Sequence, residues 1–125
     1  MKVLLIDDSP MQQKIARIYL EKGEGYEMFT ANNGKEGVAL ARVEHPDLIL
    51  LDIEMPEMNG EEALKIIKAD IDLNDIPVIM CTGNEDLVME EKTRAMGAVA
   101  FIKKPHGFST LKNIIKDIIN TDSAM

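Results

Sequence analysis

The chain alternates five times between a short apolar run and a segment with helical periodicity, and this alternation restricts the fold more than any other feature. The apolar runs are nearly continuous, which is typical of strands buried on both faces. Strands that alternate with helices through short connections predict a parallel sheet with helices on both sides. We therefore predict an α/β fold with a five-stranded, doubly wound parallel sheet. The predicted strands are 2–7, 26–31, 47–51, 77–81 and 99–102, and the predicted helices are 9–22, 35–43, 59–68, 85–96 and 108–119.

The first predicted helix has a clear start signal. Ser9 is followed by Pro10, and this pair is typical of a helix N-terminus because the hydroxyl caps free amides and proline suits the first turn. Further along, Ile15, Ile18 and Tyr19 recur at helical spacing. This spacing predicts that the helix continues to about Lys22.

Three aspartates stand at the ends of two predicted strands. Asp7 and Asp8 follow the first apolar run, and Asp52 follows the third predicted strand. The carboxyl ends of parallel strands meet at one edge of the sheet, where open α/β sheets bind ligands. Clustered carboxylates repel one another, and oxygen ligands suit Mg²⁺ or a similar hard cation. We therefore predict a divalent metal site at this edge, with Asp52 held exposed by the loop that contains Pro56.

Two further polar residues end the fourth and fifth predicted strands. Taken alone, Thr82 and Lys104 are ordinary, since turn hydroxyls and surface lysines are common. Asp8 alone is equally ordinary, because an aspartate in this position can cap a helix. Together, a hydroxyl, a lysine and a metal ion around a carboxylate form an environment that stabilises an anion. A phosphoryl group on Asp52 would require such an environment.

The composition excludes several classes of function. At 125 residues the chain is expected to form one domain, 1–125. A net charge of −8 and a pI of 4.7 argue against binding to nucleic acid or to an anionic membrane. No apolar run approaches the roughly 20 residues of a membrane-spanning helix, and no signal segment is visible. Cys81 is the single cysteine, which predicts a buried thiol in a reducing compartment, and we expect a cytoplasmic protein.

These residues resemble, over almost the full chain, the receiver domain of bacterial two-component response regulators. The resemblance implies a flavodoxin-like (βα)5 fold with strand order 2-1-3-4-5, and the chain is most similar to single-domain regulators of the chemotaxis type. Each motif is weak alone, but together, in this order and at these spacings, they are specific. The motifs are the acidic pair 7–8, the Asp-x-x-Met-Pro-x-Met-Asn-Gly run at 52–60, Thr82-Gly83, and the segment 97–105 with Gly97-Ala98, Phe101-Ile102 and Lys104-Pro105.

The resemblance also implies which groups bind the cation. Asp8 and Asp52 would supply carboxylates, and Asp7 would act largely through water. The backbone carbonyl of Glu54 would be a further protein ligand. The ion would be Mg²⁺ or Mn²⁺.

By the same resemblance, Asp52 is the phospho-acceptor. Thr82 would donate its hydroxyl to one phosphoryl oxygen and Lys104 would pair with another. Phe101 matches the switch aromatic of the family, and the bond to Pro105 matches its usual cis peptide. The donor would be a sensor histidine kinase or a histidine phosphotransfer protein. An output protein would read the surface formed by the fourth helix, fifth strand and fifth helix. Such a domain is not an enzyme, because it catalyses only its own phosphorylation and dephosphorylation.

Three positions depart from the family pattern or vary within it. Glu54 lies two residues after the acceptor and Asn84 two residues after Thr82, and the family associates these two positions with the lifetime of the phosphoryl group. His106 replaces the apolar residue that is common after Lys-Pro. We interpret His106 as a solvated histidine in a turn.

Two alternative functions remain at this stage. The chain could be the excised receiver of a larger DNA-binding regulator, which the length of the full gene would decide. It could also be a small phosphohydrolase with an aspartate nucleophile, since Asp52 and Glu54 faintly resemble the haloacid-dehalogenase pair. In that family, however, the nucleophile follows the first strand, where this chain carries Asp7 and Asp8.

Overall fold

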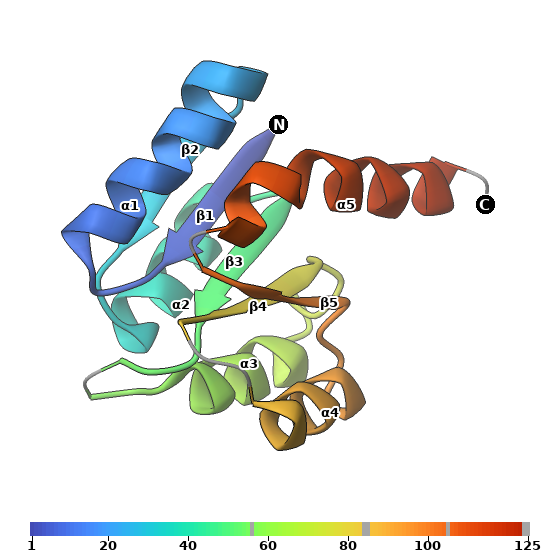
Figure 1. Ribbon diagram of the computed structural model, residues 1–125. Helices are drawn as coiled ribbons and strands as arrows, with labels where there is room; N and C mark the ends of the chain where they lie inside the picture. Colours follow the sequence, from blue (N-terminus) through green and yellow to red (C-terminus); the bar gives the residue numbers. More distant parts are fainter. Residues whose placement is uncertain (56, 84–85, 105, 124–125) are drawn as a thin grey trace.

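The predicted fold class and strand order are both confirmed. The sheet has five parallel strands in the order β2-β1-β3-β4-β5 (Figure 1). The strands are β1 (Lys2–Ile6), β2 (Glu27–Ala31), β3 (Leu48–Asp52), β4 (Val78–Thr82) and β5 (Ala100–Lys103). The helices are α1 (Pro10–Arg17), the π-helical segment η1 (Ile18–Lys22), α2 (Gly34–Glu44), α3 (Gly60–Ala69), α4 (Leu87–Ala95) and α5 (His106–Ser123). This computed structural model describes residues 1–55, 57–83, 86–104 and 106–123, except for the side chains of 106–108 and 119–123.

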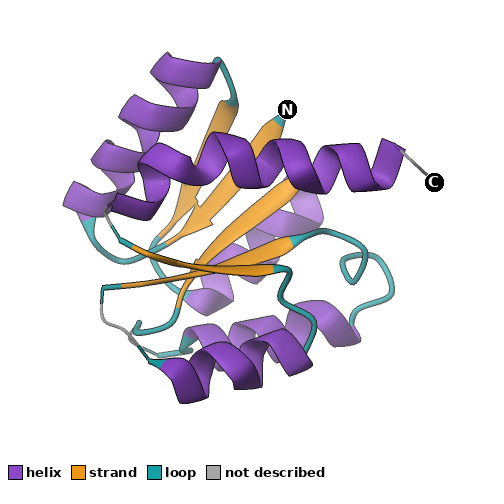
Figure 2. Cartoon of the chain, turned by 45° about the vertical axis from the view of Figure 1, so that its right-hand side comes forward, coloured by secondary structure: helices purple, strands orange, loops and turns teal. Residues whose placement is uncertain are grey.

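Helices cover both faces of the sheet (Figure 2). On one face α1, η1 and α5 bury side chains such as Ala16 and Leu111. On the other face α2 and α3 bury Val38 and Leu64, with partly buried α4 side chains packed against the same cluster. Cys81 is buried as predicted, and this burial raises the pKa of its thiol. Among the described residues, no helix combines the length and the apolar character that crossing a membrane requires.

The first helix continues through η1 to Lys22 as predicted, but the residues that recur at helical spacing do not form its buried face. Ile18 and Tyr19 are 48% and 44% exposed, and Ile15 is only partly buried. Ala16 and Leu20 are buried against the sheet instead. These two residues are four apart and therefore share one helical face. Ile18 follows Ala16 by two residues and therefore lies on the opposite, solvent-facing side of the helix.

The other boundaries agree with the prediction to within a few residues. Ser9 caps α1, because its hydroxyl oxygen accepts a backbone hydrogen bond at 3.3 Å from the first turn. β4 begins at Val78 rather than Pro77, since proline has no N–H to give to the ladder. The last helix, His106–Ser123, is longer at both ends than the predicted 108–119.

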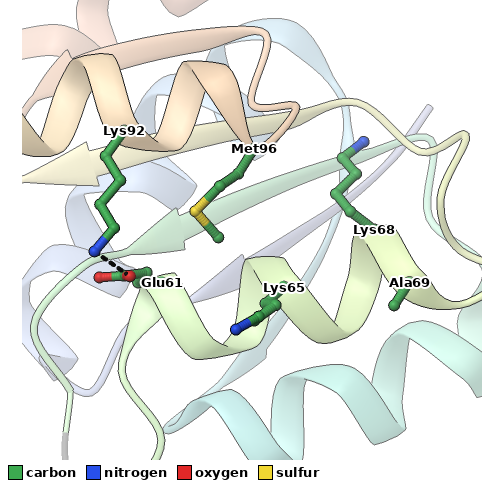
Figure 3. Close-up of a pocket in the computed structure, with 6 residues that line it drawn as sticks. All are labelled: Glu61, Lys65, Lys68, Ala69, Lys92 and Met96. Atoms are coloured by element: carbon green, nitrogen blue, oxygen red, sulfur yellow. Dashed lines mark ion pairs between the residues drawn. The ribbon is translucent and has the colours of Figure 1, made fainter.

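A cavity of about 510 Å³ lies between α3 and α4 (Figure 3). Lys92 on α4 pairs with Glu61 on α3 at 2.6 Å across it. Lys68 donates to the carbonyls of Asn74 and Ile76, both at 3.1 Å, and so holds the loop after α3. Two of the three lysines around the cavity therefore join parts of the fold to one another. The lining residues are Glu61, Lys65, Lys68, Ala69, Lys92 and Met96.

Candidate phospho-acceptor and metal site

The carboxyl ends of four strands meet at one edge of the sheet and bring the predicted site residues together. Asp7 directly follows β1, Asp52 is the last residue of β3, and Thr82 is the last residue of β4. Lys104 directly follows β5, and its amide donates to the carbonyl of Thr82 at 2.6 Å. The strand order places β1 and β4 on either side of β3, so Asp52 lies at the centre of the group.

Asp7 is fully buried and its polar groups are engaged. Its backbone N–H donates to the carbonyl of Ala31 at 3.0 Å. One carboxylate oxygen accepts from the amide of Ser9 at 2.9 Å, and the other accepts from the ammonium of Lys104 at 2.8 Å. Asp7 therefore ties together the turn after β1, the end of β2 and the residue that follows β5.

Lys104 forms ion pairs with two carboxylates at once. Its ammonium lies 2.8 Å from Asp7 and 3.1 Å from Asp52, and its side chain is only 8% exposed. Burial alone would lower the pKa of Lys104, but the hydrogen bond to Asp7 and the charges of both carboxylates raise it overall. Lys104 is therefore held as a cation inside the site.

The pKa of the Asp52 carboxyl group lies well above its ordinary value. Burial raises this pKa to about 6, and the nearby charge of Asp7 adds to the effect. Lys104 and the backbone N–H of Glu54, which donates to the carboxylate, lower it but do not cancel the rise. Without a further cation, the site is therefore short of positive charge.

The prediction that Asp52 is exposed is wrong. The residue is 5% exposed, whereas Asp8 is the exposed acid of the three. The pattern of the sequence placed Asp52 at the end of a strand, but it did not show that Lys104 extends across this end from β5. The two side chains pair, and each shields the other from solvent.

The three carboxylates are close enough to share one cation. Asp7, Asp8 and Asp52 each offer a carboxylate oxygen, and these three atoms lie within 4.8 Å of one another. Such a set of hard oxygen donors fits Mg²⁺ or Mn²⁺. The carboxylate that is open to solvent, that of Asp8, gives an ion a route into the cluster.

The loop after Asp52 is shaped by close backbone contacts. Gly60, the first residue of α3, donates its amide to the carbonyl of Ile53 at 2.8 Å. A Cβ atom at Gly60 would collide with the carbonyl oxygen of Asp52, so only glycine allows this approach. Asn59 then caps α3 by accepting from the amide of Glu62 at 2.9 Å. The Asn59-Gly60 pair therefore starts α3 close against the backbone of Asp52.

The remaining predicted residues differ in how far the structure describes them. Thr82 is buried, and Phe101 is half-buried against the cluster on the α2 and α3 face. The predictions for Asn84, for the bond to Pro105 and for bracing by Pro56 concern residues outside those described, and the His106 side chain is likewise not described. Sequence reasoning missed Gln13, which lies one turn into α1. Its side-chain amide contacts the turn after β1 that contains Asp7 and Asp8.

Comparisons with known proteins agree with this geometry. The chain matches the family model of the response regulator receiver domain over residues 3–116. It is 41% identical over 103 residues to the polar-differentiation response regulator DivK of Brucella ovis, covering 82% of this chain and 83% of that protein. It is 36% identical over 118 residues to protein PilH of Pseudomonas aeruginosa, covering 94% and 97%. The structure of the chemotaxis protein CheY4 of Vibrio cholerae matches with a TM-score of 0.84 and 30% identity, covering 93% and 96%.

An open parallel sheet with an acidic cluster and a buried lysine at its carboxyl edge defines a class of signalling domain rather than a classical enzyme. The chain belongs to the response regulator receiver domain family of two-component systems. The phosphohydrolase alternative is not favoured by these matches.

Proposed function

We propose that residues 1–125 act as one receiver domain in which Asp52 accepts a phosphoryl group from a phosphohistidine. The observation that carries the proposal is the buried contact of Lys104 with both Asp7 and Asp52, beside a third carboxylate. The test is incubation of the whole chain with radiolabelled acetyl phosphate and Mg²⁺. Label that hydroxylamine removes supports an acyl phosphate, and absence of label contradicts the proposal.

Transfer of the phosphoryl group would use the side chains of Asp52, Lys104 and Thr82. A carboxylate oxygen of Asp52 donates an electron pair to phosphorus as the phosphorus–nitrogen bond breaks. The departing electron pair goes to the imidazole, which leaves as a neutral ring when its other nitrogen carries a proton. Lys104 offsets negative charge on the phosphoryl oxygens, and Thr82 donates its hydroxyl to one of them.

A divalent cation completes the balance of charge. Asp8 and Asp52 would hold Mg²⁺ or Mn²⁺ with the backbone carbonyl of Glu54, and Asp7 would contact it through water. The bound ion supplies positive charge for the transferring phosphoryl oxygens. Its site requires Asp52 to be ionised, which the shortage of positive charge around this residue opposes in the absence of the ion.

Phosphorylation then changes a surface for a partner. Thr82 would move toward the phosphoryl group, and Phe101, now half-buried, would turn into the space it leaves. The altered surface is that of α4, β5 and α5, which an output protein would read. A sensor histidine kinase or a histidine phosphotransfer protein would be the donor. The domain would catalyse only its own phosphorylation and dephosphorylation, in the cytoplasm, without direct contact with nucleic acid.

Replacing Asp8 by Ala is expected to weaken Mg²⁺ binding without unfolding the protein. The carboxylate is exposed, and its removal relieves repulsion within the cluster, so the free energy of unfolding stays equal or rises in the absence of metal. Loss of one of the carboxylate ligands is expected to cost about 2 kcal/mol of binding, roughly 30-fold in Kd. Isothermal titration with Mg²⁺ and urea unfolding in EDTA measure the two effects. An unchanged Mg²⁺ affinity would contradict the assignment.

Replacing Glu54 by Ala is expected to shorten the half-life of the phosphorylated protein. Hydrolysis needs a water in line with phosphorus, opposite Asp52, and the exposed Glu54 side chain lies two residues after the acceptor. Its bulk and charge would obstruct this water, at a cost of about 1.4 kcal/mol, or about tenfold in rate. The decay of label after removal of the donor measures the effect, with Asn84→Ala as the comparison variant, for which we expect less change. A longer half-life in Glu54→Ala would show that Glu54 assists the water instead.

A further inference from the structure

The side chain of Gln13 contacts the turn after β1 that contains Asp7 and Asp8, although Gln13 is not one of the site residues described above. Its amide nitrogen donates to the backbone carbonyl of Asp7 at 2.7 Å and to the side-chain oxygen of Asn32 at 3.0 Å. A primary amide has two N–H groups, so it can make both bonds at once. One side chain on α1 thus joins the turn after β1 to the loop between β2 and α2.

The bond from Gln13 supplies the last polar contact of Asp7. The backbone N–H of Asp7 is bound to Ala31, and its two carboxylate oxygens are bound to Ser9 and Lys104. The carbonyl oxygen is the remaining group, and Gln13 satisfies it. Because a buried carbonyl without a donor is costly, this contact fixes the peptide that links Asp7 to Asp8.

The position of this peptide matters because carboxylates repel one another. The cluster keeps oxygens of Asp7, Asp8 and Asp52 within 4.8 Å of one another, and Asp8 is its exposed member. We propose that Gln13 is a positioning residue, which with Asn32 clamps the Asp7–Asp8 turn in the geometry that a divalent cation needs. This inference rests on the proposed function and adds a residue outside the ligand set.

The first test compares two identical substitutions on neighbouring residues of α1. Gln13→Met removes the donor, whereas Gln12→Met removes a side-chain oxygen that is buried without a hydrogen-bond partner among the described residues. Partners that orient metal ligands typically change metal affinity 10–100-fold when they are lost. We expect Gln13→Met to weaken Mg²⁺ binding about tenfold in isothermal titration, and Gln12→Met to leave it near the wild-type value. Equal affinities in the two variants would overturn the proposal.

The second test needs no metal. The amide of Ser9 is bound to the carboxylate of Asp7, so its hydrogen exchange reports opening of the turn. In EDTA we expect the exchange of this amide to be about fivefold faster in Gln13→Met and unchanged in Gln12→Met, as measured by NMR. Unchanged exchange in Gln13→Met would overturn the clamp even if Mg²⁺ affinity fell.

The role of Asn32 is tested by rescue. Asn32→Asp keeps an oxygen acceptor for Gln13 and is expected to keep the slow Ser9 exchange, whereas Asn32→Ala is expected to speed it. In the double variant with Gln13→Met, Asn32→Ala is expected to add little, because the shared contact is already lost. Fully additive effects would overturn the clamp. If wild-type protein bound no Mg²⁺, the proposed function would fail, while the exchange of Ser9 would still decide whether the clamp exists.

Discussion

Asp52→Asn is expected to abolish phosphoryl incorporation from acetyl phosphate. An amide oxygen is a far weaker nucleophile than a carboxylate, and the other carboxylates of the site are either bound on both oxygens, as in Asp7, or exposed to solvent, as in Asp8. The labelling reaction with Mg²⁺ measures the effect, and circular dichroism confirms that the variant is folded. Label of wild-type intensity in Asp52→Asn would refute the assignment of the acceptor.

The same variant is expected to be more stable than wild type when metal is absent. The pKa of Asp52 is about 6 in the folded protein, above its value of 3.8 in a model compound, so the folded state holds this proton more tightly than the unfolded state. Wild-type stability is therefore lost as pH rises from about 4 to about 6. At pH 7.5 in EDTA, Asp52→Asn is expected to gain about 2 kcal/mol in urea unfolding, and at pH 4 almost nothing. An equal gain at both pH values would show that charge is not the cause.

The fold follows from the sequence because its strongest signals are local. Continuous apolar runs and capping residues place strands and helices, and the parallel alternation then leaves few topologies. The gathering of site residues at the carboxyl edge of the sheet also follows from the sequence, since Asp7, Asp52 and Thr82 each lie at the end of an apolar run. These features depend on position along a strand, which the sequence records directly.

Features that depend on contacts between distant segments were not predictable in the same way. The burial of Asp52 depends on Lys104, which is distant in sequence and follows the edge strand β5. The contact of Gln13 with Asn32 joins residues 19 apart in the chain. The exposure of Ile18 depends on which face of the first helix packs on the sheet, which hydrophobic spacing alone does not indicate.

Lys104→Ala is expected to have the largest effect on stability. Among the described residues, Lys104 is the only cation that pairs with Asp7 or Asp52, and both carboxylates are buried. Removal of one partner of a buried pair typically costs about 3–5 kcal/mol, because the remaining charge has no compensation. The carboxylates can escape part of this cost by binding a proton, so we expect a loss of about 3 kcal/mol at pH 8 in EDTA.

The pH and metal dependence of this loss separates charge from packing. Without Lys104 the pKa of Asp52 rises further above 6, so at pH 5 the folded variant binds a proton and the loss becomes smaller. Mg²⁺ replaces part of the missing positive charge and is expected to restore stability at pH 8. Lys103→Ala, on the neighbouring exposed residue, is the control and is expected to change stability by less than about 0.5 kcal/mol. A loss in Lys104→Ala that neither acid nor Mg²⁺ reduces would show that the lysine acts through packing.

Lys104→Ala also separates phosphorylation from its consequences. Asp52 and the acidic cluster remain, so the variant is expected to take up label at a reduced rate. Its response is expected to fail, because the Lys104 side chain would bind the phosphoryl group, and the backbone hydrogen bond from residue 104 to the carbonyl of Thr82, which the variant keeps, does not replace that contact. Amide chemical shifts of α4 and β5 before and after phosphorylation measure this response. Wild-type shift changes in the phosphorylated variant would show that the signal reaches this surface without Lys104, leaving Thr82 and Phe101 as the groups that carry it.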